Sequence, residues 1–262
     1  MDQFAVVLEQ YESPPPEKVS VLFQAICGLP KLDATQRATK VRGIVAERLP
    51  GDLAQKLQVA LSNLKFPSRV VPQQRLPEPI KGRRVQLVVA DAQHFGVRWS
   101  VTGQPRFYPW SHVITISAGV VYRESSEQVM RTVEVRGLMG SGRGSPHVTT
   151  EISRRDTSRD MAMALITLGA SPNQLETLHL RAPEMDYASM LGEANVRPSP
   201  LQNFCLLLAK IGNLATQAEI TEETIELITA ANTTPRLPRS PRFESEDEFD
   251  FYQRWLVAKR LA

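Results

Sequence analysis

Apolar and polar positions alternate in a way that divides the first 76 residues into short elements. Residues 4–8 are apolar throughout, which is typical of a strand. Apolar residues then recur at helical spacing in residues 17–27, 33–45 and 52–64, so the pattern predicts three helices. Residues 69–71 follow as a second strand. The expected order for residues 1–76 is β-α-α-α-β, with the two strands side by side.

Prolines interrupt this pattern at residues 77–82, which we expect to be a semi-extended linker. A second unit, residues 83–232, begins with period-2 alternation and ends with helical spacing. Strands are expected at 85–89, 95–99, 106–116, 119–122, 129–135, 146–154, 161–168 and 175–181. An apolar helix from Pro200 to Ile211 and a short one after Thr221 follow. The pattern predicts an α+β protein, in which an antiparallel β sandwich or barrel is closed by helices.

The last stretch, residues 233–262, begins with a segment rich in proline and arginine. It ends in a predicted amphipathic helix whose stripe consists of Phe249, Tyr252, Trp255 and Leu256. Such a stripe must be buried, either against its own chain or in the groove of a partner, and the sequence leaves both open.

Composition narrows the class of protein. The chain has 262 residues, 42% of them hydrophobic, and a net charge of +3 with a pI near 8.9, which does not indicate a dedicated nucleic-acid domain. Cys27 and Cys205 lie in apolar helical stretches and are expected to be free thiols in a reducing compartment. Because no basic leader and no apolar run of membrane length is present, we expect a cytoplasmic protein.

Residues that support catalysis do not form a recognisable set. The four histidines are scattered, and neither a metal-ligand spacing nor a nucleophile motif occurs, so the sequence predicts no enzyme, metal or cofactor. Ser141, Gly142, Arg143 and Gly144 form a glycine-rich loop that is a candidate anion site. A hairpin tip is the favoured interpretation, because the loop lacks the Gly-Lys-Ser/Thr ending.

The first unit resembles the fold shared by the C-terminal domain of the bacterial ribosomal stalk protein and the S-type Clp-protease adaptor. The resemblance rests on residues 4–8, 16–19, 28–29, 34–41 and 54–61. It implies a partner groove at Gln10, Tyr11, Glu12 and Arg42. Arg42 would repel an ammonium group, so the implied ligand differs from the N-terminal amine that the adaptor holds.

The second unit resembles a bacterial pleckstrin-homology-like domain, through residues 95–99, a turn, and the passage from Phe107 to Ile114 that contains Pro109-Trp110. The aromatic residues of this passage are expected in the core of the sandwich rather than on a partner-facing patch. We therefore expect a protein–protein interaction or adaptor protein whose partner is another protein or peptide. The alternative is a nucleic-acid- or ribosome-associated protein, and the oligomeric state stays open.

Overall fold

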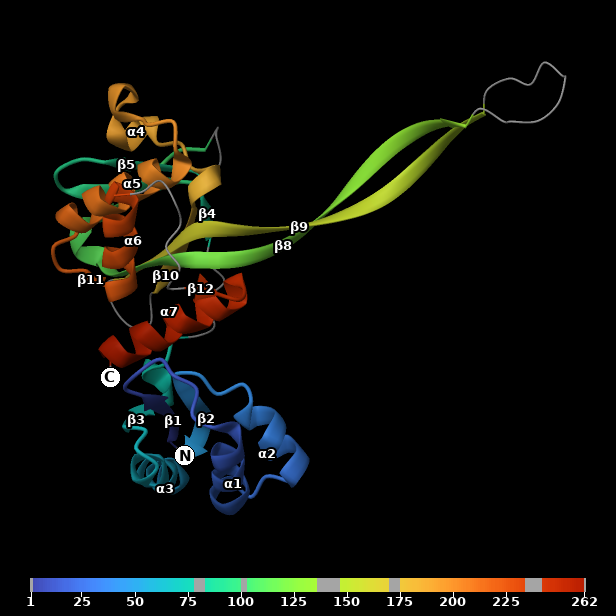
Figure 1. The fold of residues 1–262 in the computed structure, drawn as a ribbon. Helices are drawn as coiled ribbons and strands as arrows, with labels where there is room; N and C mark the ends of the chain where they lie inside the picture. Colours follow the sequence, from blue (N-terminus) through green and yellow to red (C-terminus); the bar gives the residue numbers. More distant parts are fainter. Residues whose placement is uncertain are drawn as a thin grey trace, which may run out of the picture.

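A computed structural model of the chain describes residues 2–77, 83–99, 103–135, 147–169, 175–233 and 242–261. For residues 123–135, 147–159, 231–233 and 261 it describes the backbone alone. Two compact parts lie on opposite sides of the helix α7, and a long hairpin projects from one of them (Figure 1). We call residues 2–77 the first domain and residues 83–233 the second domain.

The first domain is a three-stranded antiparallel sheet with helices on one face (Figure 1). Its elements are β1 Gln3–Leu8, α1 Pro16–Cys27, α2 Lys31–Ala38, β2 Ile44–Pro50, α3 Gly51–Asn63 and β3 Ser68–Pro72. The strand order is β2-β1-β3, so β1 is the central strand. The expected pairing of the first and last strands is confirmed, with Phe4 opposite Pro72 and Leu8 opposite Ser68.

Both faces of β1 are buried, which explains why its sequence is apolar throughout. Val6 and Leu8 pack against α1, α2 and α3 in one hydrophobic cluster. Ala5 and Val7 point to the opposite face and belong to a second cluster that includes α7. The central strand thus joins the core of the first domain to the packing around α7.

The helix expected across residues 33–45 is wrong in its second half. Helix α2 ends at Ala38, and residues 44–50 form strand β2 beside β1. Gly43, with φ of 63°, lies between the end of the helix and the strand, in a conformation that a helix does not allow, and the β-branched pair that follows favours a strand. Val41 and Val45 are buried as the spacing suggested, so the apolar positions were right although the element was not.

The second domain contains two sheets and a closing helix. A three-stranded antiparallel sheet consists of β5 Leu87–Ala90, β6 His94–Arg98 and β7 Arg106–Pro109. The larger sheet has the order β11-β8-β9-β10-β4, and β12 also pairs with β8. The bounds of these strands are β4 Arg83–Val85, β8 Val113–Val135, β9 His147–Leu168, β10 Glu176–Arg181, β11 Glu219–Ile220 and β12 Arg242–Phe243. This mixed architecture confirms the α+β class.

Helix α5, Pro200–Leu214, closes the space between these sheets. Its residues Phe204, Leu207 and Ile211 share one hydrophobic cluster with strands of both sheets. The helix begins as the sequence suggested, because Ser199 accepts a 3.4 Å hydrogen bond from the Gln202 backbone N–H and a proline follows it. The short helix α4 Ala188–Leu191 and helix α6 Glu222–Thr233 complete the domain.

Several strands that the pattern predicts as separate are joined into two long strands. Residues 113–135 are one strand of 23 residues, and residues 147–168 are one of 22. They pair antiparallel from Val113 opposite Leu168 to Val135 opposite His147. The polar residues near residue 125 lie beyond Val121, the last position at which β12 pairs with β8.

Candidate interaction site

Helix α7, Glu246–Leu261, is buried on almost all sides, including every residue from Tyr252 to Ala258. One side faces the open face of the β2-β1-β3 sheet, and the other faces β8 and β9 of the larger sheet. The aromatic stripe Phe249, Tyr252, Trp255 and Leu256 is therefore buried within its own chain. Helix α7 therefore joins the two domains through its contacts with both.

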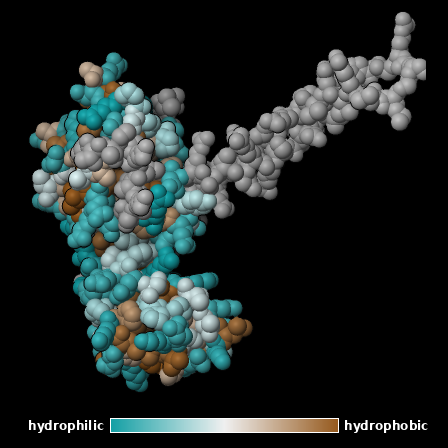
Figure 2. All heavy atoms as spheres, viewed as in Figure 1, coloured by the Kyte–Doolittle hydropathy of each residue, from teal (hydrophilic) through white to brown (hydrophobic). Residues whose placement is uncertain are grey.

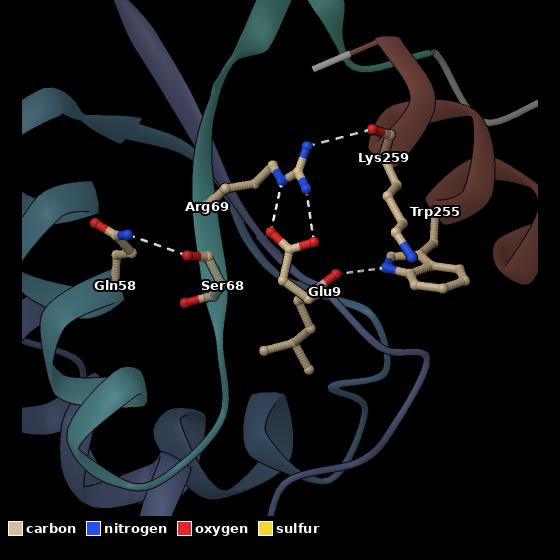
Figure 3. Close-up of polar contacts among 7 residues, drawn as sticks. Glu9, Gln58, Ser68, Arg69, Trp255 and Lys259 are labelled. Atoms are coloured by element: carbon tan, nitrogen blue, oxygen red, sulfur yellow. Dashed lines mark hydrogen bonds and ion pairs between the residues drawn. The ribbon is translucent and has the colours of Figure 1, made fainter.

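Trp255 makes the central polar contact with the first domain. Its indole Nε1–H donates a 2.8 Å hydrogen bond to the carbonyl of Leu8, at the end of β1 (Figure 3). The Lys259 ammonium lies 5.3 Å from the indole centroid, at cation–π distance. Arg69 donates to the Lys259 carbonyl at 3.5 Å and to both oxygens of Glu9 at 2.7 and 2.6 Å. The hydrogen bond from Arg69 lowers the pKa of Glu9.

Of the four residues implied as a partner groove, Tyr11 and Arg42 contact this helix. The Tyr11 ring makes an edge contact with Tyr252, with centroids 4.8 Å apart, and contacts Trp255 at 5.3 Å. Arg42 forms an ion pair with Glu248 of α7. Gln10 and Glu12 form the turn around Tyr11, where the Glu12 N–H donates to the Gln10 carbonyl at 3.0 Å. Tyr11 and Arg42 therefore contact the aromatic tail, whereas Gln10 and Glu12 are placed near it by their position in the turn.

Gly43 allows α7 to approach the first domain closely. Its φ of 63° lies in the left-handed region, and a Cβ there would lie 2.7 Å from Cγ and Cδ1 of Trp255. The same Cβ would lie 2.9 Å from the Tyr11 ring. A side chain at this position therefore displaces the indole. Burial among these rings also raises the pKa of Tyr11 to about 12.

A partly buried ion pair joins α7 to strand β2. Arg254 binds Glu47 with both ends of its guanidinium, at 2.7 and 2.8 Å, and its Nε–H donates to the Pro77 carbonyl at 2.6 Å. Burial raises the pKa of Glu47, but the hydrogen bonds and charge of Arg254 outweigh it, so the pKa lies below 4.5. Arg254 and Glu47 also border an open cleft of about 890 Å³ that includes Phe4, Arg48 and Gln73.

The opposite side of α7 presents polar groups to the larger sheet. Gln253 donates to the hydroxyls of Thr115 at 2.6 Å and Thr167 at 2.7 Å, and accepts from Ser117. Nearer the N-terminus of α7, Asp250 lies 3.0 Å from His179 and Glu246 pairs with Arg181, and both of these partners are on β10. One buried face of α7 is apolar and the other carries polar groups. The apolar stripe in the sequence therefore predicted the contact of the aromatic residues but not the polar contact with the larger sheet.

Sequence reasoning missed Gly43, Glu47, Gln253 and Arg254. Gln253 and Arg254 could have been identified from their position, because both lie in the otherwise apolar segment from Tyr252 to Ala258. Polar residues at such positions need buried partners. Their partners lie more than 85 positions away along the chain, so spacing alone does not reveal them.

The hairpin formed by residues 123–135 and 147–159 is the second candidate element, and we call it the arm. At its foot, β11 and β12 pair with β8 no further than Val121, and β10 pairs with β9 no further than Met163. Within the described residues, the arm's strands therefore pair only with each other. An open pocket of about 750 Å³ lies at the foot, lined by Val120, Tyr122, Asp160 and residues 242–246.

The remaining expectations fall in different places. Ser141, Gly142, Arg143 and Gly144, the candidate anion loop, lie outside the described residues. Trp110 and Tyr108 are buried in the core of the second domain, whereas Phe107 is exposed. Among the described residues, no helix combines the length and apolar content needed to span a membrane, and no group of three candidate ligands is placed to hold a metal ion.

The chain has no match among protein-family models, curated proteins or solved structures. The function proposed below therefore depends on the geometry of α7 and the arm.

Proposed function

We propose that the protein acts by binding another protein, as an interaction or adaptor protein without catalytic activity, and that the arm is its recognition element. The observation that carries this proposal is the pair of open edges along the arm. Each edge offers backbone N–H and C=O groups that no described strand takes up.

An isolated two-stranded ribbon is marginally stable in water. The arm has 13 residues in each strand, roughly 43 Å at 3.3 Å per residue, and the body covers neither edge within the described residues. Pairing with a strand of a partner would satisfy the edge groups and stabilise the ribbon, which is a common mode of protein recognition.

The body supports this role by holding the foot of the arm in place. Helix α7 packs against β8 and β9 immediately before the arm begins, through a cluster that includes Val121, Met161 and Met163. The first domain adds a second candidate contact surface, because apolar side chains are visible on its exterior (Figure 2). Val21, Leu32 and Val59 are exposed residues of this domain. The resemblance to stalk, adaptor and pleckstrin-homology-like domains agrees with a binding role by analogy.

A matched pair of variants tests the proposal. In the first, an Asn-Gly turn joins Tyr122 to Asp160, which removes the arm and leaves the strand pairs below it. In the second, Val21→Ser and Leu32→Ser alter the first domain's surface only. Partner proteins are first captured with the intact chain and purified. They should no longer bind the armless variant, and they should still bind the variant with Val21→Ser and Leu32→Ser. An armless variant that melts normally and binds every partner with unchanged affinity would disprove the proposal.

Nucleic acid is the rival ligand, because the arm contains Arg123, Arg131, Arg154, Arg155 and Arg159. Its acidic residues are equally numerous: Glu124, Glu127, Glu134, Glu151 and Asp156. A balanced arm favours a protein over a phosphate backbone. Binding of the intact chain to RNA or DNA that weakens steeply with salt would replace the proposed function, whereas no binding at low salt would remove the rival.

A further inference from the structure

The outer edge of β9 in the arm is the longest strand edge that the described residues leave without a neighbour. It runs from His147 to Arg159, and inward of it β10 begins to pair only at Met163. Among the described residues outside the arm's hairpin, the longest strand, β2, has seven residues. No described strand outside the hairpin is therefore long enough to cover the whole edge, and a strand of another chain of similar length would fit it.

We infer that two copies of the chain pair through these β9 edges, antiparallel about a two-fold axis at Ser153. The inference rests on the proposed role of the arm as an interaction element and names one of its partners, a second copy of this chain. The product is a four-stranded sheet with the order β8-β9-β9-β8, and the two bodies lie at its opposite ends. A two-fold axis makes each strand cover the other over the same length, so the contact is closed and self-complementary.

The sequence of β9 fits this register. With Ser153 on the axis, Glu151 lies opposite Arg155 of the second copy, and the symmetry repeats this pair of opposite charges. Thr149 likewise lies opposite Thr157 of the second copy, a pair that stabilises antiparallel sheets. Opposite charges and threonines therefore meet at four positions of the contact.

Antiparallel pairing of two β8 edges about a two-fold axis is less favourable. Full overlap of residues 123–135 about an axis at Val129 places Glu127 opposite Arg131 of the second copy, but it also places Glu124 opposite Glu134, each pair twice. The β9 register places no two acidic residues and no two arginines opposite each other. Like charges directly opposite each other destabilise a sheet. Self-pairing is thus assigned to β9, and the β8 edges stay available on the outside of the four-stranded sheet for a different protein.

Mass and cross-linking together test the inference. The intact chain should have twice the mass of the 29.3 kDa monomer, and the armless variant should have the mass of its own, smaller monomer. In a background with Cys27→Ser, which leaves only the buried Cys205, Ser153→Cys should form a disulfide with itself under mild oxidation. Directly opposite residues have Cα atoms about 4.5–5.5 Å apart, within the range that a disulfide bridges.

Register is tested by a matched set of cysteines. Thr149→Cys alone should not cross-link, because its symmetry mate lies eight positions away along the strand, roughly 27 Å. A mixture of Thr149→Cys and Thr157→Cys chains should cross-link as a heterodimer.

A monomeric intact chain, or cross-linking of Thr149→Cys as efficient as that of Ser153→Cys, would overturn the inference. If the chain is monomeric but still captures other proteins through its arm, the inference fails and the proposed function stands. If it is dimeric through the arm and captures no other protein, the inference stands and the adaptor function fails.

Discussion

Trp255 and Leu8 are 247 positions apart in the sequence, and the indole N–H of one donates a 2.8 Å hydrogen bond to the carbonyl of the other. Leu8 ends the central strand of the first domain, and Trp255 lies on the helix that also contacts the second. Gln253, two residues earlier, makes the corresponding polar contact with the larger sheet. Three neighbouring positions on one helix, Gln253 to Trp255, thus connect both domains.

Replacing Trp255 with phenylalanine keeps an aromatic ring but removes the donor to Leu8. We expect a loss of about 1–3 kcal/mol in the free energy of unfolding, measured in urea, because a buried carbonyl loses its partner. Trp99→Phe is the matched control, since its buried indole N–H has no hydrogen-bond partner among the described residues. Equal losses for the two variants would show that the hydrogen bond contributes nothing.

Substitution of Gly43 by alanine should destabilise the chain more than substitution of Gly28. Both residues have positive φ, 63° and 66°, so both variants bear the same conformational penalty of about 1–2 kcal/mol. Only at Gly43 does the new Cβ meet Trp255 and Tyr11, whereas nothing lies within 4 Å at Gly28. We expect about 1–3 kcal/mol of additional loss at Gly43, detected by urea unfolding. Similar values at both sites would contradict the close approach.

The Glu47–Arg254 pair should behave as a coupled unit. Arg254→Met leaves a half-buried carboxylate without its partner, so we expect a loss near the lower end of about 3–5 kcal/mol. Combining it with Glu47→Gln should cost less than the sum of the two single losses, by about 1–3 kcal/mol in a double-mutant cycle. Glu219→Gln, which breaks an exposed pair with Arg260, should change stability by less than about 1 kcal/mol. Strict additivity at Glu47 and Arg254 would be evidence against the coupling.

Acid should weaken the same contact. The folded chain holds the pKa of Glu47 below the value of 4.5 expected when unfolded, so protonation favours the unfolded chain. The stabilisation is fully present above pH 4.5 and is lost as pH falls through 4.5 towards the lowered pKa. Unfolding of the intact chain and of Glu47→Gln, followed across this range, should show a gap in stability that closes with acid. A gap that is constant with pH would contradict this assignment.

Gln253→Leu should destabilise the junction although it adds apolar volume. The substitution leaves the hydroxyls of Thr115, Ser117 and Thr167 without this partner, and we expect a loss of about 2 kcal/mol or more. Gln58→Leu, which removes a single hydrogen bond to the Ser68 carbonyl, should cost less in the same urea assay. A neutral or stabilising Gln253→Leu would show that the polar network is dispensable.

Sequence patterns predicted most helices that bury one face and the strand β1, which is buried on both faces. The periodicity of α1, α3 and α5 was sufficient, and so was the apolar run of β1, because in each case local spacing reflects burial. Strand β2 was missed, since Val41 and Val45 fit helical spacing equally well and only Gly43 marks the change. The tail's aromatic stripe was recognised, but its partner depended on contacts across the whole chain, which local spacing does not contain.

The position of α7 in the sequence has a consequence for synthesis. Ribosomes add about 5–20 residues per second, so α7 is complete roughly 9–37 s after the first domain. Throughout that interval, Ala5 and Val7 on the open face of the first domain's sheet lack the helix that buries them. The nascent chain therefore carries an uncovered apolar sheet face that other nascent chains or chaperones can reach, and the two domains become one body only when the helix has left the ribosome.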